Sequence, residues 1–330
     1  MNVSKLLVVS VLGVWCAASV SAAALFPVAM GGRWGFADKS GKLVVNPQFD
    51  RAEIFSGKLA AVRLGKWGYA DSTGTLAINP QFDTAANFSE SLAAVAVGGH
   101  YGFIGLDGKY VVNPQFDDAS SFVEGRAAIK ENHHWGFIDK TGKIVINPQF
   151  DEAADFSSGL AAIKLGKSYG YIDETGKMLI NPQFDRALAF SEGLAAVRMG
   201  DRWGFVDKTG KVVINPQFDD AGAFVKGLAP IKMGKSWGYV DTSGKIVINP
   251  QFDDAGAFAA GLARVKSGGH WGFINVEGKY VINPQFDEAQ DFNDGLARVG
   301  LGSAFTGAFT GGRKIGYVDT DGKYVWNPNK

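Results

Sequence analysis

The stretch GRWGFADKSGKLVVNPQFD at residues 32–50 is followed by GKWGYADSTGTLAINPQFD at residues 65–83, and the same text recurs to the end of the chain. Glycines that follow an aromatic residue or, once, Ile315 are spaced by 33 residues, then six times by 34, then by 44. The pentapeptide NPQFD occurs eight times, and a ninth copy begins at Asn327. Self-similarity at a fixed period identifies repeat architectures, so residues 25–330 are predicted to form nine tandem units.

One unit, residues 160–193, shows the expected local structure. LAAIK at 160–164, YGYID at 169–173 and KMLI at 177–180 are short apolar or alternating runs, which predict three strands. The turn ETGK places a glycine where a hairpin loop needs a left-handed residue. Proline cannot donate to a strand ladder, so Asn181-Pro182 is expected to end the third strand. The connector QFDRALAFSEG at 183–193 fits a short fourth strand, a helical turn or a loop. No segment has an extended helical pattern, so the fold is predicted to be all-β.

The aromatic-Gly-aromatic strand, the D-x-x-G-K turn and the NPQFD connector resemble those of the bacterial WG-repeat (KWG) proteins over roughly residues 25–330. This resemblance implies β-rich tandem repeats in mostly bacterial, often exported proteins. It implies no common catalytic residues, so none is carried over to this chain.

The repeats can stack in two ways, as an open array or as a closed ring. Propellers typically have about 4–8 four-stranded blades, with about 40 or more residues per blade in the common classes. A unit of 34 residues is short for four strands. We therefore expect three-stranded β-hairpin repeats in an open β-superhelix or solenoid, with a closed β-propeller-like ring as the alternative.

The N-terminus differs from the repeats. Lys5 precedes an apolar run at residues 6–18, and small residues follow at 19–24, a pattern typical of a cleavable signal peptide at residues 1–24. The alternative is an uncleaved anchor helix over residues 6–24. The single cysteine, Cys16, lies inside this segment, so no disulfide is expected in the mature chain. We expect a periplasmic or secreted protein with no integral membrane span after cleavage.

Composition and motifs argue against several kinds of chemistry. Lys+Arg and Asp+Glu number 33 each, so nucleic acid is not an expected partner. G-x-S-x-G matches at residues 166–170 and 234–238 fall in predicted hairpins, whereas a nucleophile elbow needs a strand-to-helix turn. Four histidines without cysteine make a poor zinc site, and one aspartate per turn is too few oxygens for calcium. We expect no catalytic residue, no cofactor and no metal.

Residues present in every unit serve what every unit shares, which is stacking on a neighbour. The glycine beside each aromatic is therefore expected where backbones of neighbouring layers approach closely. The aromatic slot is expected to pack between repeats; the alternative is a strip of rings on which sugars stack. This slot holds Trp34, Trp67, Tyr101, Trp135, Tyr169, Trp203, Trp237 and Trp271.

Binding positions in repeat proteins are those that vary. The last unit has a hairpin insertion at residues 301–313, in which Phe305, Thr306, Phe309 and Thr310 are candidate partner-binding residues or a cap on the sheet edge. One variable set precedes the aromatic: Lys66, His100, His133, Arg202, Lys235 and His270. Another follows NPQFD: Arg51, Thr84, Asp118, Glu152, Arg186, Asp220, Asp254 and Glu288. Both sets serve either recognition or solubility.

These observations predict a non-enzymatic, exported repeat protein that binds an envelope or extracellular protein as a scaffold in the bacterial cell envelope. The alternative is a carbohydrate- or peptidoglycan-binding protein that stacks sugars on its repeated aromatics.

Overall fold

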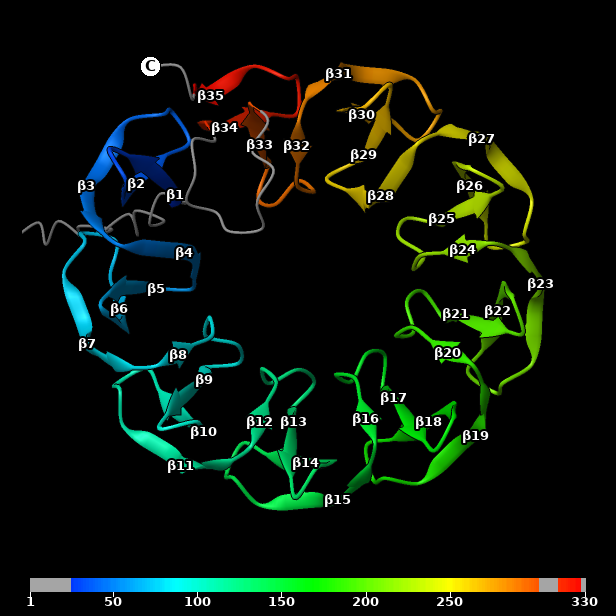
Figure 1. Cartoon of the computed structure of the whole chain (residues 1–330), viewed down its shortest axis with the longest axis horizontal. Helices are drawn as coiled ribbons and strands as arrows, with labels where there is room; N and C mark the ends of the chain where they lie inside the picture. Colours follow the sequence, from blue (N-terminus) through cyan, green and yellow to red (C-terminus); the bar gives the residue numbers. More distant parts are fainter. Residues whose placement is uncertain (1–24, 303–313, 328–330) are drawn as a thin grey trace, which may run out of the picture.

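The computed structural model describes residues 25–302 and 314–327, which form nine β-sheets arranged as blades of a ring around a central opening (Figure 1). Blades 1 to 3 contain β1 (Leu25–Met30), β2 (Arg33–Asp38), β3 (Leu43–Phe49), β4 (Arg51–Ser56), β5 (Leu59–Leu64), β6 (Lys66–Ala70), β7 (Leu76–Phe82), β8 (Thr84–Ala85), β9 (Leu92–Val97), β10 (His100–Gly105) and β11 (Tyr110–Phe116). Blades 4 to 6 contain β12 (Asp118–Ala119), β13 (Arg126–Glu131), β14 (His134–Asp139), β15 (Ile144–Phe150), β16 (Glu152–Ala153), β17 (Leu160–Leu165), β18 (Ser168–Asp173), β19 (Met178–Phe184), β20 (Arg186–Ala187), β21 (Leu194–Met199), β22 (Arg202–Asp207) and β23 (Val212–Phe218). Blades 7 to 9 contain β24 (Asp220–Ala221), β25 (Leu228–Met233), β26 (Ser236–Asp241), β27 (Ile246–Phe252), β28 (Asp254–Ala259), β29 (Leu262–Ser267), β30 (His270–Ile274), β31 (Tyr280–Phe286), β32 (Glu288–Ala289), β33 (Leu296–Leu301), β34 (Lys314–Asp319) and β35 (Tyr324–Trp326).

Each blade is an antiparallel sheet whose strands follow chain order from the central opening outward, as in β16-β17-β18-β19 (Figure 1). The outermost strand then crosses to the innermost strand of the next blade. Blade 1 is the exception among the described residues, because its sheet contains only β1, β2 and β3. The all-β prediction is confirmed.

The expected open solenoid is wrong; the chain is a nine-bladed propeller, which was the alternative. Four strands fit into a short repeat because the innermost strand is often a two-residue strand directly after NPQFD, as in β16. The outermost strand also does not stop at the proline, since β19 runs on to Phe184. A strand at the sheet edge tolerates proline, because it has no further ladder that needs the missing N–H.

The Trp-Gly and Asn-Pro motifs fit each other within one blade. Tyr169 pairs with Phe184 and Tyr171 with Ile180, so β19 bulges between these pairs. A Cβ on Gly170 would lie 2.4 Å from the Ile180 carbonyl oxygen, a separation that no side chain tolerates. The close approach predicted from this glycine therefore exists, but it joins two strands of the same blade, not two layers.

The D-x-x-G-K turn has the predicted structure. The Asp173 carboxylate accepts hydrogen bonds from the Thr175 N–H at 2.9 Å, the Thr175 hydroxyl at 2.6 Å and the Lys177 N–H at 3.0 Å. These bonds, the hydroxyl bond first, lower the pKa of Asp173. Gly176 has φ 85°, the left-handed conformation that the turn requires.

Neighbouring blades are held together by pairs of aromatic rings, all of them buried except the half-buried Phe55. A ring from the third strand of one blade (β2 in blade 1) packs on a phenylalanine of the next blade, with centroids 4.7–5.1 Å apart. This phenylalanine lies in the inner connector, the segment between NPQFD and the second strand. The pairs are Phe36–Phe55, Tyr69–Phe88, Phe103–Phe122, Phe137–Phe156, Tyr171–Phe190, Phe205–Phe224, Tyr239–Phe258 and Phe273–Phe292. The core is therefore a ring of clusters between blades.

Candidate functional site

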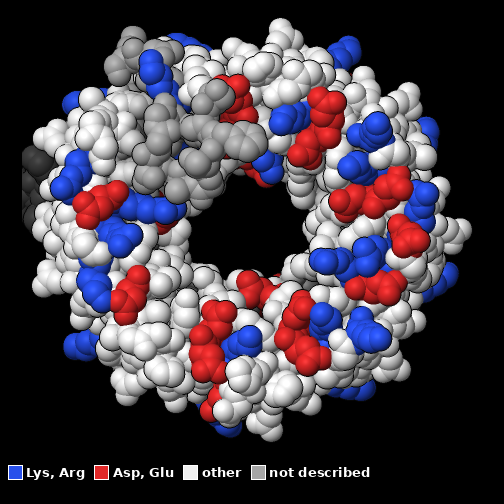
Figure 2. All heavy atoms as spheres, viewed as in Figure 1, with Lys and Arg blue, Asp and Glu red and all other residues white. Residues whose placement is uncertain are grey.

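Antiparallel order places two kinds of connection on each face of the ring. One face carries the hairpin between the second and third strands of each blade together with the NPQFD connector. The other carries the D-x-x-G-K turns together with the inner connectors between the first and second strands. We call the first the WG face, because each repeated aromatic lies there, at the start of a third strand. Figure 2 shows that basic and acidic side chains alternate around the central opening, with no large sector of one sign.

The repeated aromatics lie at the edge of the core. Trp203 is buried, and Trp34, Trp67, Tyr101, Trp135, Tyr169, Trp237 and Trp271 are half-buried. All eight pack against an apolar cluster between blades. A basic side chain lies over several of the rings, such as Lys130 at 5.8 Å from the Trp135 centroid and Arg264 at 5.0 Å from that of Trp271. The same rings therefore contribute to packing and to the surface.

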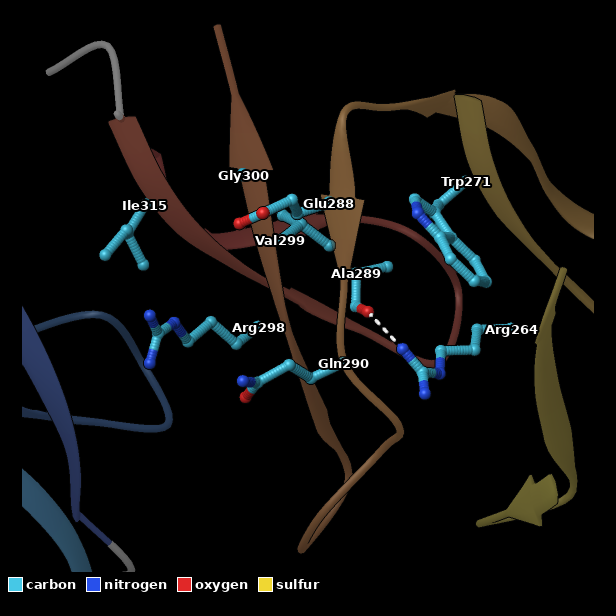
Figure 3. A pocket seen from close by; sticks show the side chains of 9 residues that line it. All are labelled: Arg264, Trp271, Glu288, Ala289, Gln290, Arg298, Val299, Gly300 and Ile315. Carbon is cyan, nitrogen blue, oxygen red and sulfur yellow. Dashed lines mark hydrogen bonds between the residues drawn. The ribbon is translucent and has the colours of Figure 1, made fainter. Parts of the chain in front are cut away.

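A groove of about 290 Å³ lies between blades 8 and 9. Figure 3 shows Trp271 and Arg264 on one side, Arg298 and Ile315 on the other, and Glu288 and Gln290 between them. Arg264 is fixed in place, because its Nη1 donates to the Ala289 carbonyl at 3.0 Å and its Nε lies 2.8 Å from Asp291 Oδ1. The groove thus combines an aromatic ring with guanidinium, carboxylate and amide groups.

Two adjoining grooves lie around blades 5 to 7, with volumes of about 370 and 330 Å³. Both are lined by Glu152, Tyr169 and Arg186. Glu152 accepts hydrogen bonds from Lys164 Nζ at 2.7 Å and from Tyr169 Oη at 2.5 Å. The Lys164 bond is the main reason that the pKa of Glu152 is lowered, so this carboxylate is ionised at neutral pH.

The variable set that follows NPQFD forms part of these grooves. Its members pair across to the second strand, and in four blades an acid faces a lysine: Asp118 and Lys130, Glu152 and Lys164, Asp220 and Lys232, Asp254 and Lys266. In two blades an arginine faces an arginine: Arg51 and Arg63, Arg186 and Arg198. These positions stand out in the sequence, but their partners follow only from the strand register.

The variable set before the aromatic has a structural role in several blades. Lys66 pairs with Asp83, Arg202 with Asp219, and His270 with Asp287 at 3.4 Å. These aspartates belong to NPQFD and also accept from a hairpin N–H, as Asp83 does from Gly98 at 2.8 Å. His100, His133 and Lys235 are exposed. Among residues 25–302 and 314–327, no three potential ligands gather as a metal site.

Two predicted features lie outside the described residues. Phe305, Thr306, Phe309 and Thr310 of the insertion fall there, as does the predicted signal peptide at residues 1–24. In the part of the chain that the structure does describe, no helix is long and apolar enough to cross a membrane.

The family model described as WG containing repeat matches the chain eight times, at residues 34–66, 67–99, 101–132, 135–168, 169–203, 203–236, 237–269 and 271–303. The chain belongs to the WG-containing-repeat family. The matches cover most of the nine blades, so this WG-repeat protein is a propeller assembled almost wholly from one motif.

Solved structures support the fold. A crystal structure of a eukaryotic initiation factor is similar with a TM-score of 0.65 and 11% identity, over 92% of this chain and 95% of that one. At that identity the likeness shows the fold alone. Hsv2p of Kluyveromyces lactis (TM-score 0.43, 10% identity, 64% of this chain and 86% of that one) and the dihydro-heme d1 dehydrogenase NirN (0.47, 11%, 78% and 72%) are weaker matches that carry no argument. No curated protein matches the sequence.

Proposed function

We propose that this WG-repeat propeller is a non-enzymatic, exported protein that binds carbohydrate in the grooves between blades on its WG face. The observation that carries the proposal is the groove between blades 8 and 9, where the half-buried ring of Trp271 shares a space of about 290 Å³ with Arg264, Glu288, Gln290 and Arg298. Small-ligand sites combine apolar and aromatic lining with a few placed polar groups. A sugar ring matches both, since its C–H face packs on an aromatic ring and its hydroxyls bond to planar side chains.

The repetition of the fold supports a polymeric ligand. Comparable grooves beside Tyr169 and Trp203 lie around blades 5 to 7. A chain of sugars that engages more than one groove gains affinity, because the later contacts form within an existing complex. Export through a signal peptide at residues 1–24 would place the protein where envelope glycans are present, and it is part of the same proposal.

The test is titration with neutral oligosaccharides, chitohexaose and maltohexaose, followed by tryptophan fluorescence and calorimetry. We expect at least one to bind, with affinity reduced ten-fold or more by Gln290→Ala and by Glu288→Gln. The matched control is Glu277→Gln, an exposed residue in a turn on the opposite face. Absence of binding at millimolar concentrations, or binding that the two groove variants leave unchanged, would rule out the proposal.

The sequence also predicts a protein partner for Phe305, Thr306, Phe309 and Thr310. This remains a prediction, which crosslinking in cells with and without residues 303–310 would test. We favour a carbohydrate ligand over a protein partner, because the grooves of the described ring have the composition of a small-ligand site.

A further inference from the structure

Two blades place an arginine opposite an arginine, and blade 6 is one of them. Arg186 on β20 lies directly opposite Arg198 on β21, where four other blades place an acid opposite a lysine. Like charges directly opposite each other in a sheet are destabilising. The pair therefore has a cost in the unliganded protein that an acid–lysine pair would not have.

Blade 2 contains the same arginine pair but satisfies it internally. There Arg51 Nε donates to Glu53 at 3.0 Å, and Arg63 Nε donates to the Gly65 carbonyl at 3.0 Å. In blade 6 the position of Glu53 is taken by Leu188. Within the described ranges, no hydrogen bond or ion pair holds the Arg186 or Arg198 guanidinium, and Arg198 Nε is buried without an acceptor.

The acids near this pair are already engaged. Glu152 accepts from Lys164 and Tyr169, and the charge of Arg186 contributes less than Lys164 to lowering its pKa. Asp185 accepts from the Gly200 N–H at 2.7 Å. Lys164 and Lys167 line the same groove of about 370 Å³, so its basic groups outnumber its acidic ones. The groove therefore has an excess of positive charge, and its volume is large enough for a small anionic group.

We propose that the groove between blades 5 and 6 binds the carboxylate of an acidic saccharide, with Arg186 and Arg198 as its ligands. Guanidinium groups match a carboxylate with paired, charge-assisted hydrogen bonds. The adjoining groove continues through Tyr169 and Arg186 to Trp203, so the sugar ring that carries the carboxylate lies beside aromatic side chains. This inference rests on the proposed function and adds to it the charge of the sugar and the blade whose arginines bind that charge.

The experiment compares trigalacturonate with its fully methyl-esterified form, which has the same rings without the charge. The wild-type protein is expected to bind the acid at least ten-fold more tightly than the ester, a preference that shrinks as salt is added. Arg186→Gln and Arg198→Gln are expected to abolish the preference, by weakening binding of the acid at least ten-fold more than binding of the ester. Arg51→Gln, the matched control in blade 2, is expected to keep it.

Each other outcome is decisive. Equal affinity for acid and ester in the wild type, or an equal loss with Arg51→Gln, overturns the carboxylate site and leaves glycan binding intact if chitohexaose or maltohexaose still binds. If no saccharide binds, both proposals fail together. A preference for inorganic phosphate over trigalacturonate that depends on Arg186 would replace the carboxylate with a phosphate group and overturn the proposal as stated.

Discussion

The seam between blades 9 and 1 and an ordinary interface, such as that between blades 3 and 4, reach the same packing by different means. At the ordinary interface the chain itself crosses from β11 to β12, and Ser89 Oγ donates to the Phe122 carbonyl at 2.5 Å. Blades 9 and 1 are not consecutive in the chain, and the described part of blade 1 has no innermost strand. The seam must therefore close through side chains.

Phe26 supplies the ring that the inner connector supplies elsewhere. It packs on Tyr317 with centroids 4.4 Å apart, against 4.9 Å for Phe103 and Phe122. Phe26 lies in β1, which corresponds to the second strand of the other blades. At its position the other eight blades have alanine: Ala60, Ala93, Ala127, Ala161, Ala195, Ala229, Ala263 and Ala297. One enlarged side chain thus compensates for a missing strand.

Two further contacts repeat the ordinary pattern across the seam. Tyr317 Oη donates to the Pro27 carbonyl at 2.8 Å, as Tyr171 Oη donates to that of Leu188 at 2.7 Å. Lys39 reaches Asp294 at 2.9 Å, as Lys140 reaches Glu90 at 2.9 Å. A pocket of about 480 Å³ remains beside Phe26 and Tyr317, where other blades have an inner strand. The ring therefore needs the contacts of each interface but not its covalent link.

The largest expected effect comes from Phe26→Ala. The other blades also have alanine at this position, but their inner connector supplies a phenylalanine, which the seam lacks. Truncating a buried phenylalanine costs about 3–5 kcal/mol, so the free energy of unfolding in urea should fall by that amount. Because no connector holds the seam, hydrogen exchange should rise first in β1 and β34.

Phe122→Ala is the control at an ordinary interface, with a similar loss of stability. Its neighbouring blades remain joined by the β11–β12 connection, so exchange should not rise selectively in the strands beside it. If hydrogen exchange rises to the same extent beside both substituted residues, the seam opens no more easily than an ordinary interface.

Much of the blade was predictable from the sequence, because local signals determine it. The period, the strands at 160–164 and 169–173, and the left-handed glycine at Gly176 all follow from residue pattern, and each is present in the structure. The sequence leaves the innermost segment open among a strand, a helical turn and a loop, because two residues show no periodicity. The passage of β19 through Pro182 depends on its edge position, which is a property of the sheet.

Ring closure and the grooves depend on contacts between distant residues. The substitution of Phe26 for alanine is visible in the sequence, but its partner Tyr317 lies at the other end of the chain. Arg186 and Glu152 stand out among the variable positions, yet only strand register shows that one faces an arginine and the other a lysine. Repeat length alone misled the choice between solenoid and ring.

A smaller effect is expected from Tyr317→Phe, which leaves the Pro27 carbonyl without its donor. Such a loss costs about 1–3 kcal/mol. Burial raises the pKa of Tyr317 to about 12, so the folded protein resists ionisation of a group that titrates near pH 10 when unfolded. Wild-type stability should therefore fall as the pH rises from about 10 to about 12.

In Tyr317→Phe this alkaline loss should be smaller, since one of the groups that cause it is gone. Tyr171→Phe is the control, because burial also raises the pKa of Tyr171. The measurement is the urea midpoint at pH 9 and pH 11.5 for the three proteins. An alkaline loss in Tyr317→Phe as large as in the wild type would show that Tyr317 is not buried at a closed seam.

The smallest effect is expected from Lys39→Met, which removes the ion pair with Asp294 across the seam. Both side chains are largely exposed, so the pair contributes about 0.2–1 kcal/mol at most and less in high salt. A double-mutant cycle with Asp294→Asn in urea, run at low and high salt, isolates this coupling. The matched pair is Lys140 and Glu90, in which Glu90 also accepts from the Gly125 N–H at 3.1 Å and its pKa is lowered chiefly by Lys140. A coupling at the seam larger than that of Lys140 and Glu90 would mean that charge holds the ring closed, and the closing role assigned to Phe26 and Tyr317 would have to be reduced accordingly.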